Sequence, residues 1–110
     1  MERETYAVLV IDDEKPIRRL LQKELATDFR EISTAGSAVE AREKLTTRWF
    51  DVIILDLRLP DINDLDLLIE IKESVPHSEV VLITGHGDID SAVQAMKLGA
   101  YDFIRKPFNL

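Results

Sequence analysis

The sequence predicts an open, doubly wound α/β domain built on a five-stranded parallel sheet. Apolar, β-branched runs alternate along the chain with segments whose apolar residues recur at helical spacing. Several runs are apolar at consecutive positions, which is typical of strands buried on both faces of a parallel sheet. Right-handed crossovers between such strands place helices on both faces. A chain of 110 residues is long enough for one domain of this kind.

Five segments are expected to be strands, because each is short, rich in β-branched residues and followed by polar or turn-forming residues. They are residues 6–11 (YAVLVI), 30–35 (REISTA), 51–55 (DVIIL), 79–84 (EVVLIT) and 100–108 (AYDFIRKPF).

Four helices are expected between these strands. The first covers residues 16–29 and has Pro16 in its first turn, the second begins at Ser37, and the last two cover residues 64–75 and 88–99. Ser37 precedes Glu40 by three residues, which is the spacing of a capping box. Gly99 is suited to end the last helix.

The periodicity also predicts which helix residues face the core. The inward residues are expected to be Ile17, Leu20, Leu21 and Leu25 in the first helix, Ala38, Ala41 and Leu45 in the second, and Ile89, Ala92, Val93 and Met96 in the last. Trp49 and Phe50 are expected to pack before the third strand.

Composition excludes several classes of protein. A net charge of −7 disfavours nucleic-acid binding, which depends on cationic groups that neutralise phosphates. No apolar run approaches the ~20 residues that span a bilayer, and the acidic start of the chain does not resemble a signal peptide. The absence of cysteine excludes disulfides and thiolate metal sites. We therefore expect a cytoplasmic protein without membrane contact.

Polar side chains gather where the predicted strands end. Asp12 and Asp13 follow the first strand, Asp56 follows the third, Thr84 ends the fourth, and Lys106 ends the fifth. Ligands of open parallel sheets bind beyond these carboxyl ends. Three carboxylates at one rim repel one another unless they share protons or bind a cation. Since the neighbouring groups offer oxygen ligands, Mg²⁺ is the better solution.

This arrangement predicts chemistry on a phosphoryl group. A hydroxyl and an ammonium group beside a metal-bound carboxylate can neutralise phosphoryl oxygens. Asp56, which stands alone between its strand and the Pro60 loop, is then the natural nucleophile and would form an aspartyl phosphate. Asp12 and Asp13 would hold the metal. Glu14 is expected to be a solvated acid outside the site.

Four motifs, VLVIDDE, VIILDLRLPD, VVLITGHGD and YDFIRKPF, resemble those of the receiver domain of bacterial two-component response regulators. The resemblance covers the whole chain, in order and spacing, and the last 25 residues before Asn109 are most similar to NtrC-type transcription activators. It implies a flavodoxin-like fold and a single receiver domain over residues 1–110 that forms the N-terminal part of a longer regulator.

The resemblance also assigns roles at the strand ends. It implies that Asp56 accepts a phosphoryl group from a histidine kinase. The metal site would hold Mg²⁺ through Asp12, Asp13, Asp56 and the backbone carbonyl of Arg58.

The remaining roles concern the response to phosphorylation. Thr84 and Lys106 match the phosphate-sensing hydroxyl and ammonium groups, and Phe103 matches an aromatic residue that changes rotamer on activation. The Lys106–Pro107 bond matches one that is usually cis. The implied partners are a sensor histidine kinase, the output domains of the same protein and a second copy in a homodimer, with no nucleic acid bound by this domain.

Two features depart from the family pattern. Asp64 stands where receivers usually carry glycine, and Asp61, Asp64 and Asp66 are expected to add negative charge near the metal. The fifth helix is missing, for which a truncated chain is the simplest explanation. His86, near Thr84, is expected to be a polar loop residue that influences the lifetime of the phosphate.

Three other functions fit the sequence less well than the signalling switch. A Mg²⁺-dependent aspartyl phosphatase usually has a second acid two residues after its nucleophile, where this chain has Arg58. A nucleotide binder needs a glycine- or hydroxyl-rich loop after the first strand, where this chain has the repelling sequence DDE. A receiver that acts only as an interaction module would not be phosphorylated. The sequence favours a phosphoacceptor regulatory domain that assists its own phosphorylation and dephosphorylation but is not otherwise an enzyme.

Overall fold

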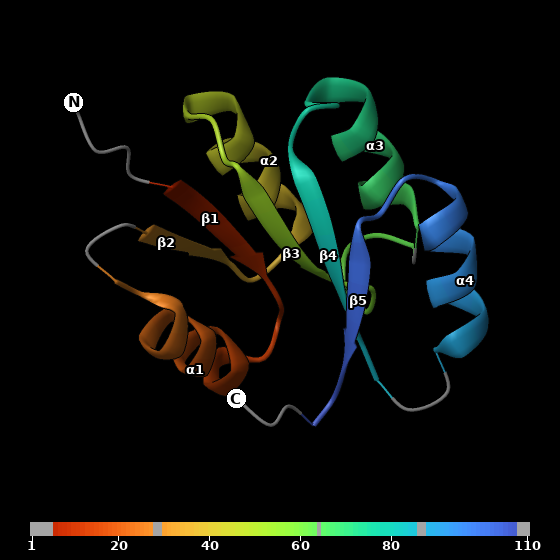
Figure 1. The fold of residues 1–110 in the computed structure, drawn as a ribbon, viewed down its shortest axis with the longest axis horizontal. Helices are drawn as coiled ribbons and strands as arrows, with labels where there is room; N and C mark the ends of the chain where they lie inside the picture. The colour runs from red at the N-terminus through yellow and green to blue at the C-terminus, as the bar shows by residue number, and fades with distance from the viewer. Residues whose placement is uncertain (1–5, 28–29, 64, 86–87, 108–110) are drawn as a thin grey trace.

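The computed structural model describes residues 6–27, 30–63, 65–85 and 88–107. Five parallel strands form one sheet in the order β2-β1-β3-β4-β5. The elements are β1 (Tyr6–Ile11), α1 (Lys15–Leu25), β2 (Arg30–Ala35), α2 (Ala38–Thr47), β3 (Val52–Asp56), α3 (Asp66–Ser74), β4 (Glu79–Thr84), α4 (Ile89–Lys97) and β5 (Asp102–Arg105). The predicted fold class is confirmed (Figure 1).

Each central strand packs against two apolar layers, as expected for a sheet covered on both faces. Leu9, Ile53 and Leu82 belong to a large core with residues of α2, α3 and α4. Val10 and Ile54, which alternate with them, belong to a smaller core with residues of α1. Successive strand residues point to opposite faces, so runs without polar positions are what this architecture requires.

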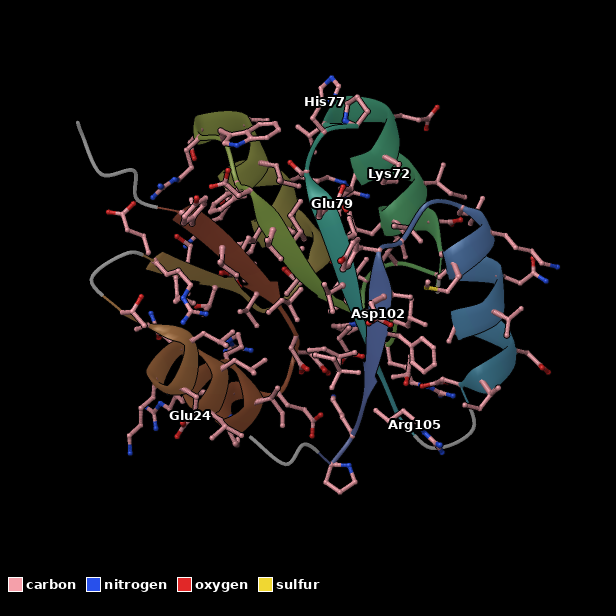
Figure 2. All side chains as sticks on the ribbon, viewed as in Figure 1. Glu24, Lys72, His77, Glu79, Asp102 and Arg105 are labelled. Atoms are coloured by element: carbon pink, nitrogen blue, oxygen red, sulfur yellow. The ribbon has the colours of Figure 1, made fainter. Side chains whose placement is uncertain are left out.

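The predicted fifth strand is longer than the observed one. β5 is limited to Asp102–Arg105, and all of its residues are exposed; Figure 2 shows the side chains of Asp102 and Arg105 at the two ends of this strand. The strand lies at the edge of the sheet and pairs with β4 alone. No helix follows β5 up to Pro107, where the description of the chain ends, in agreement with the expected lack of a fifth helix. None of the described helices is long and apolar enough to cross a membrane.

The helix ends follow the predicted signals with one difference. Pro16 lies in the first turn of α1, and Gly99 has a φ of +108°, a conformation that favours glycine. The Ser37 side chain accepts a hydrogen bond from the backbone N–H of Glu40 at 3.2 Å. The Glu40 carboxylate accepts from the N–H of Gly36, not of Ser37, so the capping box is not reciprocal.

The predicted inward face of α4 is confirmed at Ala92 and wrong at the three larger residues. Ile89, Val93 and Met96 are 45%, 47% and 37% exposed, whereas Ala92 and Ala95 are buried. The helix packs on the sheet through its small residues, and the larger apolar residues are displaced around the helix from them. The α4 surface therefore presents apolar side chains to solvent.

Two further residues that were predicted to pack inward are exposed. Leu20 is 38% exposed, because Leu21 occupies the position that faces the sheet. Trp49 is half exposed and donates to Asp51 Oδ1, whereas Phe50 is buried as predicted.

Candidate functional site

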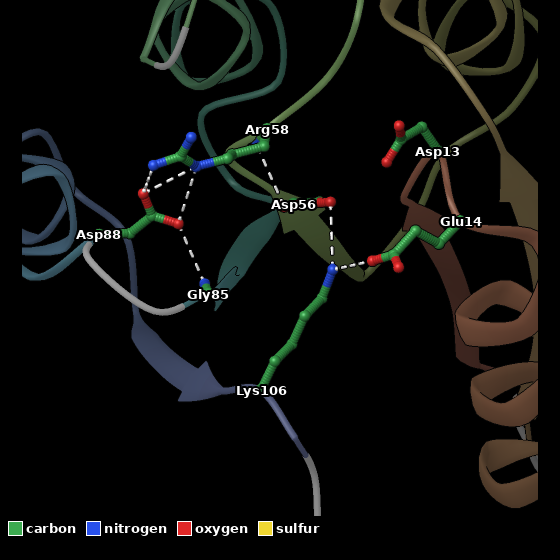
Figure 3. Close-up of a pocket in the computed structure, with 7 residues that line it drawn as sticks. All are labelled: Asp13, Glu14, Asp56, Arg58, Gly85, Asp88 and Lys106. Atoms are coloured by element: carbon green, nitrogen blue, oxygen red, sulfur yellow. Dashed lines mark hydrogen bonds and ion pairs between the residues drawn. The ribbon is translucent and has the colours of Figure 1, made fainter.

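The carboxyl ends of β1, β3 and β4 bring the predicted site residues to one rim. Ile11 is paired with Leu55, so Asp12 and Asp56 follow adjacent strand positions. Asp56 is in turn paired with Ile83, the residue before Thr84. An open pocket of about 560 Å³ lies beyond these ends (Figure 3). It is lined by Asp13, Glu14, Asp56, Arg58, Gly85, Asp88 and Lys106.

Asp12 is fully buried beneath this pocket. Its backbone N–H donates to Ala35 O at 3.0 Å, its carbonyl accepts from the guanidinium of Arg18 at 2.7 Å, and its Oδ1 accepts from the N–H of Glu14 at 2.8 Å. Its Oδ2 has no hydrogen-bond partner among the described residues, although Lys106 Nζ lies 3.1 Å away. A buried carboxylate oxygen without a hydrogen bond is a favourable ligand for a cation.

Asp56 ends β3 and is 3% exposed. Its Oδ1 accepts from the backbone N–H of Arg58 at 3.0 Å, and its Oδ2 lies 3.4 Å from Lys106 Nζ. Burial raises the pKa of this carboxyl to about 6, with a further increase from the charge of Asp12, against the lowering effects of Arg58 N–H and Lys106. The group is therefore ionised at neutral pH but weakly solvated.

Lys106 supplies the positive charge within the acidic cluster. Its backbone N–H donates to Thr84 O at 2.8 Å, and the Lys106–Pro107 bond is cis, as expected. Its Nζ lies 2.7 Å from Glu14 Oε2, closer than to Asp12 or Asp56. Burial alone would lower the pKa of this ammonium group, but the hydrogen bond to Glu14 and the neighbouring carboxylates outweigh that effect and raise it.

Glu14 was wrongly expected to lie outside the site. Ligand oxygens of Asp12, Asp13, Glu14 and Asp56 all lie within 4.8 Å of one another, a grouping that could hold a metal ion. Glu14 belongs to this cluster because it is the residue before α1. The turn of the chain into the helix directs its side chain to Lys106.

Thr84 and Phe103 lie apart from the acidic cluster. Thr84 is buried, and its hydroxyl is 3.5 Å from Ile104 O of β5. The described pocket lining does not include Thr84. Phe103 is 37% exposed on β5, where it pairs with Leu82.

The sequence did not predict the ion pair between Arg58 and Asp88. Arg58 Nε donates to both carboxylate oxygens of Asp88, at 2.9 and 3.2 Å, and Arg58 Nη2 lies 2.6 Å from Asp88 Oδ1. Asp88 is 4% exposed, and the hydrogen bond from Arg58 holds its pKa below the usual range. Arg58 thus lies at the pocket as predicted, while the metal role of its carbonyl stays a prediction.

The Asp61 carboxylate is bound at the start of α2, and the expectation that it adds negative charge near the metal stays a prediction. Its carboxylate accepts from the backbone N–H groups of Ala38 at 2.9 Å and Val39 at 3.1 Å, at the start of α2. These hydrogen bonds lower its pKa, with that from Ala38 contributing most. Asp66 lies in the first turn of α3. Asp64 and His86 are outside the described residues.

Comparison with known proteins decides the family. Residues 8–110 match the family model described as the response regulator receiver domain. The chain is a response regulator receiver domain. This receiver domain is 42% identical over 102 residues to the response regulator protein PilR of Pseudomonas aeruginosa, covering 93% of this chain and 23% of PilR. It is 37% identical over 103 residues to the DNA-binding transcriptional regulator NtrC of Escherichia coli K12, covering 94% of this chain and 22% of NtrC.

Solved structures agree with this assignment. The receiver domain of NtrX from Brucella abortus superimposes with a TM-score of 0.87 at 42% identity, covering 93% of this chain and 87% of that one. A receiver domain from Clostridium thermocellum gives a TM-score of 0.87 at 40% identity, covering 94% and 84% of the two chains. The receiver domain is thus of the NtrC type, and it spans about a quarter of the length of the curated relatives it matches.

Proposed function

We propose that this receiver domain is a phosphorylation-activated switch in which Asp56 accepts a phosphoryl group from a sensor histidine kinase. The observation that carries the proposal is the position of Asp56, which is buried at the end of β3 between Lys106 and the neighbouring acids. A carboxylate held rigidly in a weakly solvated site is a suitable nucleophile.

The reaction transfers the group between two side chains. An Asp56 carboxylate oxygen attacks the phosphorus of a phosphohistidine, forming an acyl P–O bond while the P–N bond breaks. The bonding electron pair stays on the histidine nitrogen, which is left as neutral imidazole after proton exchange with solvent. Lys106 Nζ, 3.4 Å from Asp56 Oδ2, is placed to stabilise the phosphoryl oxygens.

We propose Mg²⁺ as the cofactor. The donor set fits this ion, because it consists of carboxylate oxygens and includes the buried Oδ2 of Asp12, which has no hydrogen bond among the described residues. Asp12, Asp13, Asp56 and the backbone carbonyl of Arg58 would hold it. When bound, the ion neutralises the negative charge that gathers during phosphoryl transfer.

Phosphorylation would change the conformation of Thr84, Phe103 and the α4–β5 surface, and partners would recognise this change. Thr84 lies beside β5 through its contact with Ile104, and Phe103 lies exposed on that strand. The neighbouring α4 face exposes Ile89 and Val93, which provide apolar area for a partner. The proposed partners are a histidine kinase, the output domains of a longer transcription regulator and a second copy, all in the cytoplasm.

A regulatory role is better supported than hydrolysis. The residue two positions after Asp56 is Arg58, and its side chain is bound to Asp88. It therefore offers no carboxylate for the protonation of a leaving group. The domain would assist its own phosphorylation and dephosphorylation without acting on other substrates. The alternative is a receiver that only binds other proteins, and the test below distinguishes the two.

The test is intact-mass measurement after incubation with acetyl phosphate and Mg²⁺. The parent chain is expected to gain one phosphoryl group, and removal of Mg²⁺ with a chelator is expected to prevent the gain. Asp56→Asn, which preserves the shape of the side chain, is the matched control and should remain unlabelled. A folded parent chain that is never labelled would contradict the proposal and favour an interaction-only receiver.

A further inference from the structure

Asp56 lies between two ion pairs (Figure 3). On one side Lys106 Nζ contacts Glu14 at 2.7 Å, and on the other Arg58 Nη2 contacts Asp88 at 2.6 Å. Each cation of the pocket thus has a carboxylate other than Asp56 as its nearest partner, although Lys106 Nζ also lies 3.4 Å from Asp56 Oδ2. A phosphoryl group on Asp56 would compete for both of them.

Asp88 is placed to begin α4 but its side chain is directed elsewhere. It is the N-cap residue of this helix, where aspartate usually accepts a hydrogen bond from the first turn. Within the described chain its carboxylate makes no such bond. Instead it accepts from Arg58 and, through Oδ2, from the N–H of Gly85 at 3.0 Å. The Asp88 carboxylate is therefore bound by donors from two loops, Arg58 after β3 and Gly85 after β4.

Arg58 is within reach of a phosphoryl group on Asp56. Its backbone N–H is 3.0 Å from Asp56 Oδ1, and both residues line the same pocket. Its side chain is 68% exposed, so it can change rotamer without disturbing the core. A phosphoryl group carries roughly two negative charges and three acceptor oxygens, and the guanidinium fork binds such a group in a bidentate manner.

We propose that Arg58 is a second phosphoryl-binding cation, held by Asp88 until Asp56 is phosphorylated, and that its transfer releases the Asp88 carboxylate to cap α4. The inference rests on the proposed phosphorylation of Asp56. Asp88 is 4% exposed, so after losing Arg58 its carboxylate requires new donors. The first-turn N–H groups of α4 are the donors that an N-cap aspartate normally binds. Phosphate binding and the start of α4 are then linked by one exchange of partners.

Removing either partner of the ion pair tests this link, because the two variants are expected to differ in the protection of the first-turn amides of α4. In Arg58→Ala, Asp88 is released without phosphorylation, so the first-turn amides of α4 should become about fivefold more protected from hydrogen exchange, as for a typical N-cap. In Asp88→Ala, the cap cannot form, and phosphorylation should leave the protection of these amides unchanged. A purely structural ion pair would instead make both variants alike.

The parent chain supplies the direct readout. The Arg58 Nε–H signal in ¹⁵N NMR is expected to shift on phosphorylation with acetyl phosphate and Mg²⁺, while intact mass records the label. Asp90→Ala removes an exposed acid from the same turn of α4 and should retain the parent response. Asp88→Val, which fills the buried position but cannot accept a hydrogen bond from the first turn of α4, replaces Asp88→Ala if that variant does not fold.

The outcomes separate this inference from the proposed function. If Asp56 is labelled while the Arg58 signal and the α4 amides stay unchanged, the transfer of Arg58 is wrong and the phosphoacceptor role stands. Equal changes in Arg58→Ala and Asp88→Ala would also overturn the transfer. If the parent is never labelled, the proposed function fails and the transfer fails with it.

Discussion

The ammonium group of Lys106 lies 2.7 Å from the carboxylate of Glu14, closer than to any other acid of the pocket. These two residues are 92 positions apart in the chain, and their contact connects the end of β5 to the start of α1. Glu14 thus takes part in setting the charge around Asp56.

Glu14→Gln should weaken Mg²⁺ binding, because it removes one of the four clustered carboxylates. Asp12→Asn should weaken binding more, since Asp12 is buried and Glu14 is largely exposed. Isothermal titration calorimetry measures both affinities. The free energy of unfolding of Glu14→Gln should stay within ~1 kcal/mol of the parent value, as for an exposed ion pair. Unchanged Mg²⁺ affinity would place Glu14 outside the metal site.

The stability of the chelator-treated domain should depend on Asp56 and pH. The pKa of Asp56 is raised from 3.8 to about 6, mainly by burial, so the folded state loses stability as pH rises between these values. Asp56→Asn should therefore increase the free energy of unfolding at pH 7, by up to about 3 kcal/mol, with part of this gain offset by the lost contact with Lys106. Near pH 4 the difference should almost vanish.

Urea unfolding at the two pH values measures this effect. Asp51→Asn is a comparison at another strand boundary, and its single amide oxygen can keep one of the two hydrogen bonds that the carboxylate accepts from Ala7 N–H and Trp49 Nε1–H. A destabilised Asp56→Asn at pH 7 would show that the Lys106 contact outweighs the effect of burial.

Asp61→Ala should lower the melting temperature, because the N–H groups of Ala38 and Val39 lose the carboxylate that binds them. Mg²⁺ affinity should not change, since the Asp61 side chain is directed to α2. Asp66→Ala, which removes an acid from the first turn of α3, serves as the comparison. Weaker Mg²⁺ binding in Asp61→Ala would show that the charge of this carboxylate instead contributes to the metal site.

The exposed stripe on α4 predicts unequal tolerance of substitution. Val93→Ser should change the free energy of unfolding by less than ~1 kcal/mol, because Val93 is 47% exposed. Ala95→Val should cost ~1–3 kcal/mol, because Ala95 is fully buried and the added methyl groups have no space. Denaturant unfolding of the two variants checks the comparison. A larger loss of stability in Val93→Ser than in Ala95→Val would indicate that Val93 faces the core, as the sequence predicted.

Much of the fold was predictable because the central strands are buried on both faces. Runs such as residues 52–55 have one plausible environment, and their order along the chain limits the topology. The face of α4 was not predictable in the same way. Its sequence carries large apolar residues on one side and alanines on another, and hydrophobic periodicity favours the large ones, whereas close packing on the sheet favours Ala92 and Ala95.

Part of the site was predictable from the sequence, and part was not. Asp12, Asp56 and Lys106 follow strand ends, and the geometry of a parallel sheet brings such residues together without knowledge of the loops. Arg58 and Asp88 meet from two different loops, 30 residues apart. Loop side chains have no periodicity that fixes their direction, so neither this pair nor the contact of Asp61 with α2 could be read from spacing.

Under the proposed function, the net charge around Asp56 would also influence which phosphodonors reach it. The pocket and the adjoining Asp12 hold five carboxylates against two cations, a formal charge of −3 when all are ionised. A bound divalent cation would reduce this to −1. A small anion diffusing from solution meets an unfavourable field at the mouth, whereas a phosphodonor on a docked protein is held there by its binding surface. Added salt should therefore accelerate labelling by small donors, because it screens the negative charge of the pocket. The ratio of the labelling rates by small donors and by a docked protein should then change with ionic strength.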